Sequence, residues 1–188
     1  MNRFYVLGIG ASTGAQQSLS EFFNTLDSDL PVAIIFVSPM HDDYLKKTEE
    51  ILHHKTKMKI SILEEDMTIE KGNVYLIPEK FVLRTECGRL KVMPRKLVNE
   101  NIIDIFFESL ANDYRELAVG IILSGRGKDG VKGAMKISNQ GGCVLVQEPF
   151  SALYQSLPRE VVKVDHPYKV LPAVRLAALV NQKFRQLL

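Results

Sequence analysis

The sequence reads Phe4-Tyr5-Val6-Leu7 and then Gly8-Ile9-Gly10-Ala11-Ser12-Thr13-Gly14, an apolar run followed by a glycine-rich turn. A short strand that runs into such a turn and then into a helix lifts the turn to the rim of a sheet. Residues 10–14 read Gly-x-Ser-x-Gly, a spacing in which small neighbours leave a serine hydroxyl exposed at the start of a helix. Ser12 is therefore a candidate nucleophile.

Two other interpretations fit the same turn. Gly8-x-Gly10 followed by Gly14 approaches the glycine pattern that binds dinucleotides, although Thr13 occupies the place of the third glycine. Ser12 could also do no more than cap the helix that follows. The turn alone leaves nucleophile, nucleotide loop and helix cap open.

The composition predicts one ordinary globular domain over residues 1–188. The chain has 46% hydrophobic and 24% charged residues, and its length is enough to bury one sizeable core. The net charge of +2 is too small for a nucleic-acid-binding face, which needs clustered basic residues. We expect no nucleic-acid partner.

The cysteines, the N-terminal residues and the length of the apolar runs bear on the cellular compartment of the protein. Cys87 and Cys143 have no metal-ligand spacing, and no signal-peptide pattern follows Met1. These features favour the reducing cytoplasm. No apolar run approaches the length that spans a bilayer, so we expect no membrane insertion. We also predict no metal site and no cofactor.

The apolar runs alternate with segments of helical spacing. Residues 15–26 have apolar side chains at helical spacing, and 32–37 form an unbroken apolar run typical of a strand covered on both faces. With the run at 4–7 they make a β-α-β unit. Later segments repeat the alternation of helix and strand: 42–54, 102–114, 117–123, 131–140, 143–146 and 172–188. The pattern predicts an α/β fold with a doubly wound, mostly parallel sheet in three Rossmann-like layers.

One part of the chain has a different pattern. Short apolar runs separated by turn residues predict an antiparallel hairpin region at one edge of the sheet. These runs are 60–62, 74–77, 81–83 and 90–92. Residues 94–101 are expected to form a loop over the catalytic face, and 147–159 a long connection.

A second glycine-rich loop follows the apolar run at 117–123. It reads Ser124-Gly125-Arg126-Gly127-Lys128-Asp129-Gly130 and precedes a predicted helix. Glycines on both sides of Asp129 allow the backbone to approach another group closely, with the carboxylate directed back over the sheet. The alternative is that Asp129 only caps the helix that follows. Ser12 and Asp129 could thus be two members of a Ser-His-Asp set at one edge of a parallel sheet.

The histidine is the missing member of this set, because a serine hydroxyl is a weak nucleophile unless a base accepts its proton. The chain has His41, His53, His54 and His166. Only His41 follows a strand that neighbours the strand before Ser12. The other three are expected to be solvated surface residues.

Several motifs in the same order resemble the catalytic domain of the CheB-type chemotaxis protein-glutamate methylesterases. The resemblance spans nearly the whole chain. The matching motifs are residues 8–14, residues 123–130, Gln147-Glu148 with Leu157-Pro158-Arg159, Pro39 and Val74-Tyr75-Leu76-Ile77-Pro78.

This resemblance implies a doubly wound parallel sheet, with Ser12 as nucleophile and Asp129 as the acid of the triad. It also implies that backbone amides at Gly125 and Arg126 stabilise the oxyanion, and we count Thr13 among the supporting residues. The implied reaction is hydrolysis of glutamate methyl esters on receptor helices with release of methanol. In some members of the family it extends to deamidation of glutamine.

Two departures from the family pattern affect the prediction. The catalytic histidine usually ends the second strand, but here that place falls on Phe36 or Val37, which cannot accept a proton. His41 is the candidate substitute. Family members also commonly follow a receiver domain, and we expect none here and no control by phosphorylation within this chain.

Three hypotheses follow. The first is a methylesterase-like serine hydrolase that uses Ser12, His41 and Asp129. The second is a catalytically impaired relative that keeps the fold as a protein-binding module, because the usual histidine is replaced. The third is a nucleotide-binding Rossmann protein, which the missing third glycine and the absence of an acidic residue at the end of the second strand disfavour.

Overall fold

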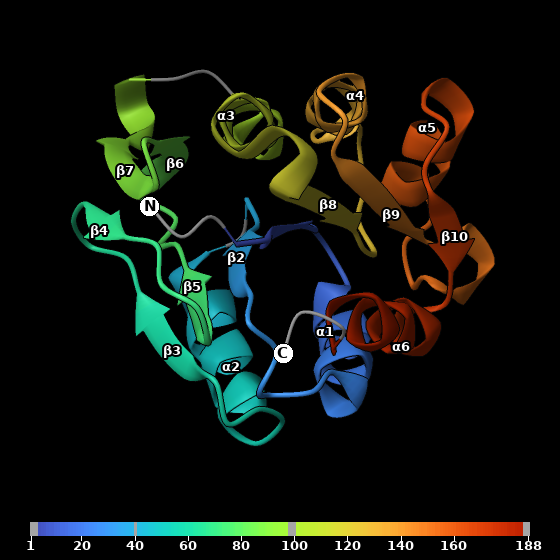
Figure 1. The fold of residues 1–188 in the computed structure, drawn as a ribbon, viewed down its shortest axis with the longest axis horizontal. Coiled ribbons are helices and arrows are strands. Elements are labelled where there is room, and N and C mark those ends of the chain that lie inside the picture. Colours follow the sequence, from blue (N-terminus) through green and yellow to red (C-terminus); the bar gives the residue numbers. More distant parts are fainter. Residues whose placement is uncertain (1–3, 40, 98–100, 186–188) are drawn as a thin grey trace.

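The computed structural model describes residues 4–39, 41–97 and 101–185. The largest element in this part of the chain is a sheet of seven parallel strands (Figure 1). In spatial order the strands are β10 (Lys169–Leu171), β9 (Cys143–Gln147), β8 (Ala118–Ile122), β1 (Val6–Gly10), β2 (Ala33–Val37), β5 (Asn73–Leu76) and β3 (Lys59–Ile62).

Helices cover both faces of this sheet, as Figure 1 shows. One face carries α1 (Ala15–Thr25), α2 (Asp42–His53) and α6 (Ala173–Phe184). The other carries α3 (Ile102–Tyr114), α4 (Val131–Asn139) and α5 (Ser156–Val164). Short 3₁₀ turns lie at Arg95–Leu97, Arg115–Leu117 and Pro149–Ser151. This three-layer arrangement confirms the predicted fold class.

The helices dock through the apolar positions that the sequence places on one side. In α1, Leu19, Phe22 and Phe23 are fully buried, at the i, i+3 and i+4 spacing of one helix face. In the centre of the sheet every residue of β1 and of β2 is buried. The unbroken run 32–37 therefore predicts β2 correctly. The first strand is placed too early, because β1 continues through residues 8–10, which the sequence pattern predicts as part of the turn.

The predicted hairpin region is only partly antiparallel. A separate sheet has the order β4 (Met67–Thr68), β7 (Arg89–Pro94) and β6 (Phe81–Glu86), and both of its pairings are antiparallel. The prediction is wrong for 60–62 and 74–77, because these segments are β3 and β5 of the large parallel sheet. All four residues of β5 are buried, so it is an interior strand.

Three other predicted segments differ from the structure. The connection predicted over 147–159 contains a 3₁₀ turn and the start of α5, and β10 follows before α6. The first residue of the loop predicted over 94–101 still belongs to β7, a 3₁₀ turn follows at Arg95–Leu97, and residues 98–100 lie outside the described part. The predicted end of the last helix, at 186–188, lies outside it too.

Gly8 and Gly10 let α3 lie directly on β1. A Cβ atom on Gly8 would lie 2.8 Å from the Phe106 ring, and one on Gly10 would lie 2.5 Å from the Ile103 side chain. A close-packed interior cannot absorb such overlaps without moving the helix. Helix packing therefore accounts for these two glycines without a nucleotide.

Candidate active site

Ser12 lies just beyond the carboxyl end of β1, on the turn that leads into α1. Its N–H donates to the Ser124 carbonyl at 3.1 Å, and its carbonyl accepts from the Ala15 N–H at 3.2 Å. Gly14, the residue before α1, has a φ of 78°, in the left-handed region that favours glycine. Since Gly14 holds the cap position and no side chain caps α1, Ser12 is not the cap of this helix.

The buried Ser124 connects this turn to the chain segments around it. Its N–H donates to Oε1 of Gln147 at 2.9 Å, and its hydroxyl donates to the Thr13 carbonyl at 3.2 Å. The same hydroxyl accepts from the Tyr154 N–H at 3.0 Å. Gln147 is itself fully buried. These bonds hold three loops in one arrangement around Ser12.

Gly125 and Arg126 continue this loop beside Ser12. A Cβ atom on Gly125 would lie 3.1 Å from both the N and the Cβ atom of Ser12, so the two backbones are in close contact. The Gly125 N–H, one of the predicted oxyanion donors, donates to the Tyr154 carbonyl at 3.0 Å. The guanidinium of the exposed Arg126 lies 4.3 Å from the centre of the Tyr154 ring.

Asp129 does not cap the helix that follows it. Its two carboxylate oxygens accept the N–H groups of Ile103 (3.1 Å) and Asp104 (2.9 Å) at the start of α3. Asp104, which is 7% exposed, accepts the N–H groups of Gly130 (2.9 Å) and Gly133 (2.8 Å) at the start of α4. Asp129, which precedes α4, thus accepts the free amides at the start of α3. Asp104, which belongs to α3, accepts free amides at the start of α4.

Burial raises the pKa of the Asp129 carboxyl from its ordinary 3.8 to about 6. The two backbone amides act in the opposite direction, the charge of Asp104 adds to the rise, and the charge of Arg95 reduces it. Both carboxylate oxygens are engaged by α3, and no hydrogen bond joins Asp129 to His41 within the described residues.

His41 is the residue before α2, four positions after β2. Its carbonyl accepts the N–H groups of Tyr44 and Leu45. Its Nδ1 atom lies 2.8 Å from Oε2 of Glu79, and its side chain is 86% exposed. Within the described part of the chain, no hydrogen bond joins His41 to Ser12.

The place where the family resemblance predicts a histidine is occupied by buried apolar side chains. Phe36 and Val37, the last two residues of β2, are 3% and 1% exposed and belong to the cores on opposite faces of the sheet. Neither presents a polar atom at the sheet edge.

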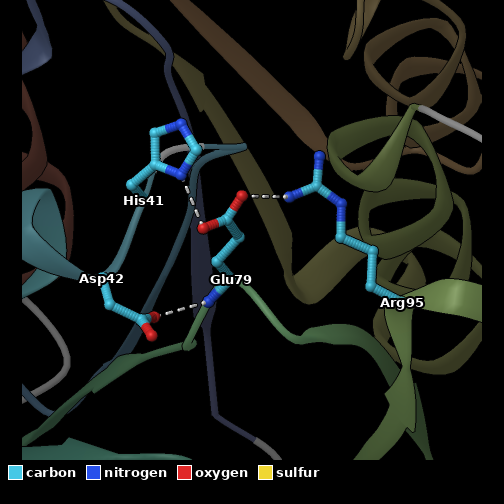
Figure 2. A network of polar contacts seen from close by, with 4 residues as sticks. All are labelled: His41, Asp42, Glu79 and Arg95. Carbon is cyan, nitrogen blue, oxygen red and sulfur yellow. Dashed lines mark hydrogen bonds and ion pairs between the residues drawn. The ribbon is translucent and has the colours of Figure 1, made fainter.

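Glu79 connects His41 to Arg95 (Figure 2). One carboxylate oxygen faces the His41 ring, and the other lies 3.7 Å from Nη1 of Arg95. The Glu79 N–H donates to Oδ1 of Asp42 at 3.3 Å. Glu79 and Arg95 also border an open groove of about 760 Å³, lined by Asp42, Glu79, Lys80, Phe81, Pro94, Arg95 and Lys96.

Sequence reasoning does not find Asp104, Gln147 or Glu79 as site residues. The signal for Asp104 is a carboxylate on the apolar side of helix 102–114, three residues before Phe107. The signal for Gln147 is its position directly after the apolar run 143–146. Glu79 carries no such signal, because it follows a segment read as part of a hairpin.

Neither a metal site nor a membrane span is visible in the described residues. They contain no group of three or more His, Cys, Asp or Glu side chains that could hold a metal ion. They also contain no helix with the length and apolar character needed to cross a bilayer.

A parallel sheet with helices on both faces, and a serine on a strand-to-helix turn at its edge, defines a class of α/β protein that often carries serine hydrolase sites. Comparison with known families makes this assignment specific. The chain belongs to the CheB methylesterase family, whose model matches residues 7–180.

Individual relatives agree with this family. A protein-glutamate methylesterase/protein-glutamine glutaminase of Methanosarcina barkeri is 29% identical over 182 residues, and the one of Thermotoga maritima is 27% identical over 177 residues. The matches cover 92% and 91% of this chain but only 50% and 52% of those proteins. The chain spans about half the length of the curated relatives it matches.

A solved structure shares the whole fold. The crystal structure of the Thermotoga maritima CheB methylesterase catalytic domain matches with a TM-score of 0.87 and 26% sequence identity. The match covers 99% of this chain and all of that one. The shared fold therefore extends over both faces of the sheet and includes the Ser12 edge.

Proposed function

We propose that this chain is one methylesterase-type catalytic domain that hydrolyses glutamate methyl esters on protein helices, with Ser12 as nucleophile. The observation that carries the proposal is the Ser12 turn, because a serine at the edge of a parallel sheet is braced by the loops of Ser124 and Tyr154. Membership of the CheB methylesterase family supports the choice of an ester substrate.

The chemistry follows the general acyl-transfer sequence. The Ser12 oxygen bonds to the ester carbonyl carbon while the Ser12 proton passes to Nε2 of His41. The carbon–oxygen bond to the methoxy group then breaks, and the imidazolium returns the proton, so that methanol leaves. Water repeats the sequence and releases the glutamate. Proton transfer requires His41 Nε2 to come within about 3 Å of the Ser12 oxygen.

The remaining predicted residues take supporting roles. The backbone amides of Thr13 and Arg126 are the proposed donors to the oxyanion, since the Gly125 amide donates to the Tyr154 carbonyl. Asp129 is the acid predicted from the resemblance to the family. The Asp129 carboxylate accepts two amides at the start of α3, which supports a role in fixing the loop that carries Gly125 and Arg126.

The names of the relatives support the proposed substrate, and the free cysteines support the proposed compartment. The names of the relatives from Methanosarcina barkeri and Thermotoga maritima include both methylesterase and glutaminase, so deamidation of glutamine is a second reaction of the same site. Methylated receptor helices are the proposed partners. The proposed compartment is the cytoplasm, where cysteines such as Cys87 and Cys143 stay reduced.

A second candidate function is a protein-binding module without catalytic activity. It is favoured by the 86% exposure of the His41 side chain and by the buried Phe36 and Val37 at the usual position of the histidine. A binding module would keep the surface of the sheet edge without needing a base beside Ser12.

Covalent labelling separates the two candidates. The hydrolase labels on Ser12 with a fluorophosphonate probe, as located by mass spectrometry, and releases methanol from a peptide glutamyl methyl ester. Ser12→Ala abolishes both signals, and His41→Gln slows labelling about 100-fold or more. His53→Gln is the matched control, because His53 is an exposed histidine at the other end of α2.

Three outcomes contradict the proposal in different ways. Wild-type protein that does not label, under conditions that label an active family member, would favour the binding module. Labelling that persists unchanged in Ser12→Ala would mean that another residue reacts. Equal labelling of wild type and His41→Gln would remove His41 as the base.

A further inference from the structure

The geometry points to Glu79, and not Asp129, as the positioning residue that orients His41 for proton transfer. This inference rests on the proposed hydrolase activity of Ser12. It assigns a role to a residue that follows β5, on the other side of β2 from the Ser12 strand.

The sheet order brings the relevant residues to one edge. Gly10 at the end of β1 pairs with Val37 at the end of β2, and Phe36 pairs with Leu76 at the end of β5. Ser12, His41 and Glu79 follow these three neighbouring strands. Because the strands are parallel, the chain leaves all three at the same edge of the sheet.

Backbone hydrogen bonds fix the position of Glu79. Its N–H donates to the Asp42 carboxylate at 3.3 Å (Figure 2). The Arg95 N–H donates to the carbonyl of the next residue, Lys80, at 2.8 Å. The Glu79 carboxylate lies between His41 and Arg95. The charged groups of the adjoining groove are Asp42, Lys80, Arg95 and Lys96.

The contact with Nδ1 sets the protonation pattern of the ring. A carboxylate accepts hydrogen bonds and cannot donate them, so Glu79 selects the tautomer of His41 that carries its proton on Nδ1. Nε2 is then the unprotonated nitrogen, which is the form a general base needs. In serine hydrolases a carboxylate has this function, and its loss leaves the histidine in the wrong tautomer.

No hydrogen bond joins Asp129 to the His41 ring among the described residues. Asp129 follows β8, on the opposite side of β1, and both of its oxygens accept amides of α3. The family resemblance predicts a histidine at the end of β2, where this chain has Phe36 and Val37. A base displaced to His41 takes its acid partner from β5 instead of β8.

Two measurements on the whole chain test this role. In the wild type, ¹⁵N NMR of the neutral His41 ring shows the proton on Nδ1, and in Glu79→Gln the population shifts to the Nε2-protonated form. Labelling of Ser12 by a fluorophosphonate slows about tenfold or more in Glu79→Gln and recovers in part in Glu79→Asp. Asp43→Asn, an exposed acid in the first turn of α2, labels within about twofold of wild type.

The results separate this inference from the proposed function. Suppose that Ser12 of the wild type is labelled by the fluorophosphonate and that labelling is slow in His41→Gln. If Ser12 of Glu79→Gln is then labelled at the wild-type rate, Glu79 is not the positioning residue. A neutral His41 that carries its proton on Nε2 in the wild type also overturns the inference. A wild type that does not label on Ser12 overturns the proposed function and, with it, this role of Glu79.

Discussion

The two sides of the Ser12 strand are built differently. On the β8 side, Asp129 and the buried Asp104 exchange hydrogen bonds between the first turns of α3 and α4. On the β5 side, Glu79 contacts a histidine whose side chain is 86% exposed. The acid that the family resemblance predicts, Asp129, therefore bonds to helix amides, whereas Glu79 faces the His41 ring on one side and Arg95 on the other.

The largest expected effect is on the β8 side. Asp104→Ala leaves the N–H groups of Gly130 and Gly133 without their acceptor, in a position that is 7% exposed. Buried amides without partners cost roughly 1–3 kcal/mol each, so we expect a loss of about 2–4 kcal/mol of unfolding free energy. Urea denaturation measures it. A loss below about 0.5 kcal/mol would mean that the exchange does not stabilise the fold.

Asp129→Asn is expected to have a smaller effect that depends on pH. Because the folded pKa is raised to about 6, the folded protein holds a proton that the unfolded chain releases between about pH 4 and pH 6. The contribution of Asp129 to the unfolding free energy of the wild type therefore falls as the pH rises from about 4 to 6. Above about pH 6 this contribution no longer changes with pH. Asn has no proton to bind and lacks this component.

The comparison of the two proteins across pH isolates the Asp129 component. The stability of wild type relative to Asp129→Asn decreases by about 1–3 kcal/mol between pH 4 and pH 6. The loss of one acceptor, since the Asn side chain has a single oxygen for two amides, costs roughly 1 kcal/mol at every pH. A stability difference that does not change with pH would contradict the raised pKa.

The smallest effects on stability belong to the β5 side. Glu79→Gln and His41→Gln are each expected to change the unfolding free energy by less than about 0.5 kcal/mol, because exposed ion pairs contribute little. Urea denaturation at pH 7 measures both variants. A loss of 2 kcal/mol or more in either variant would mean that this side is structural, as the β8 side is.

Much of the fold could be predicted from local patterns. Apolar runs identify β2 and β8, since strands covered on both faces carry few polar side chains, and they locate only the start of β1. Helix α5 is missed because its first four residues are assigned to the connection over 147–159, and its Pro158 lies in the first turn, where a proline loses no hydrogen bond that the helix needs.

The site was only partly predictable. The Ser12 turn is local, because small residues and the left-handed Gly14 create it within the segment itself. The partners of Asp129 and His41 depend on which elements meet in three dimensions. The placement of β5 inside the parallel sheet decides that Glu79 reaches the edge beside His41, and no local pattern reports that placement.

We propose that Ser12 reacts with the help of His41. The most direct test is the rate of fluorophosphonate labelling at Ser12 in wild type, His41→Gln and the control His53→Gln. We predict that wild type and His53→Gln label at similar rates and that His41→Gln is slower by about 100-fold or more. Labelling of His41→Gln at the wild-type rate, or no labelling of the wild type, would contradict the claim.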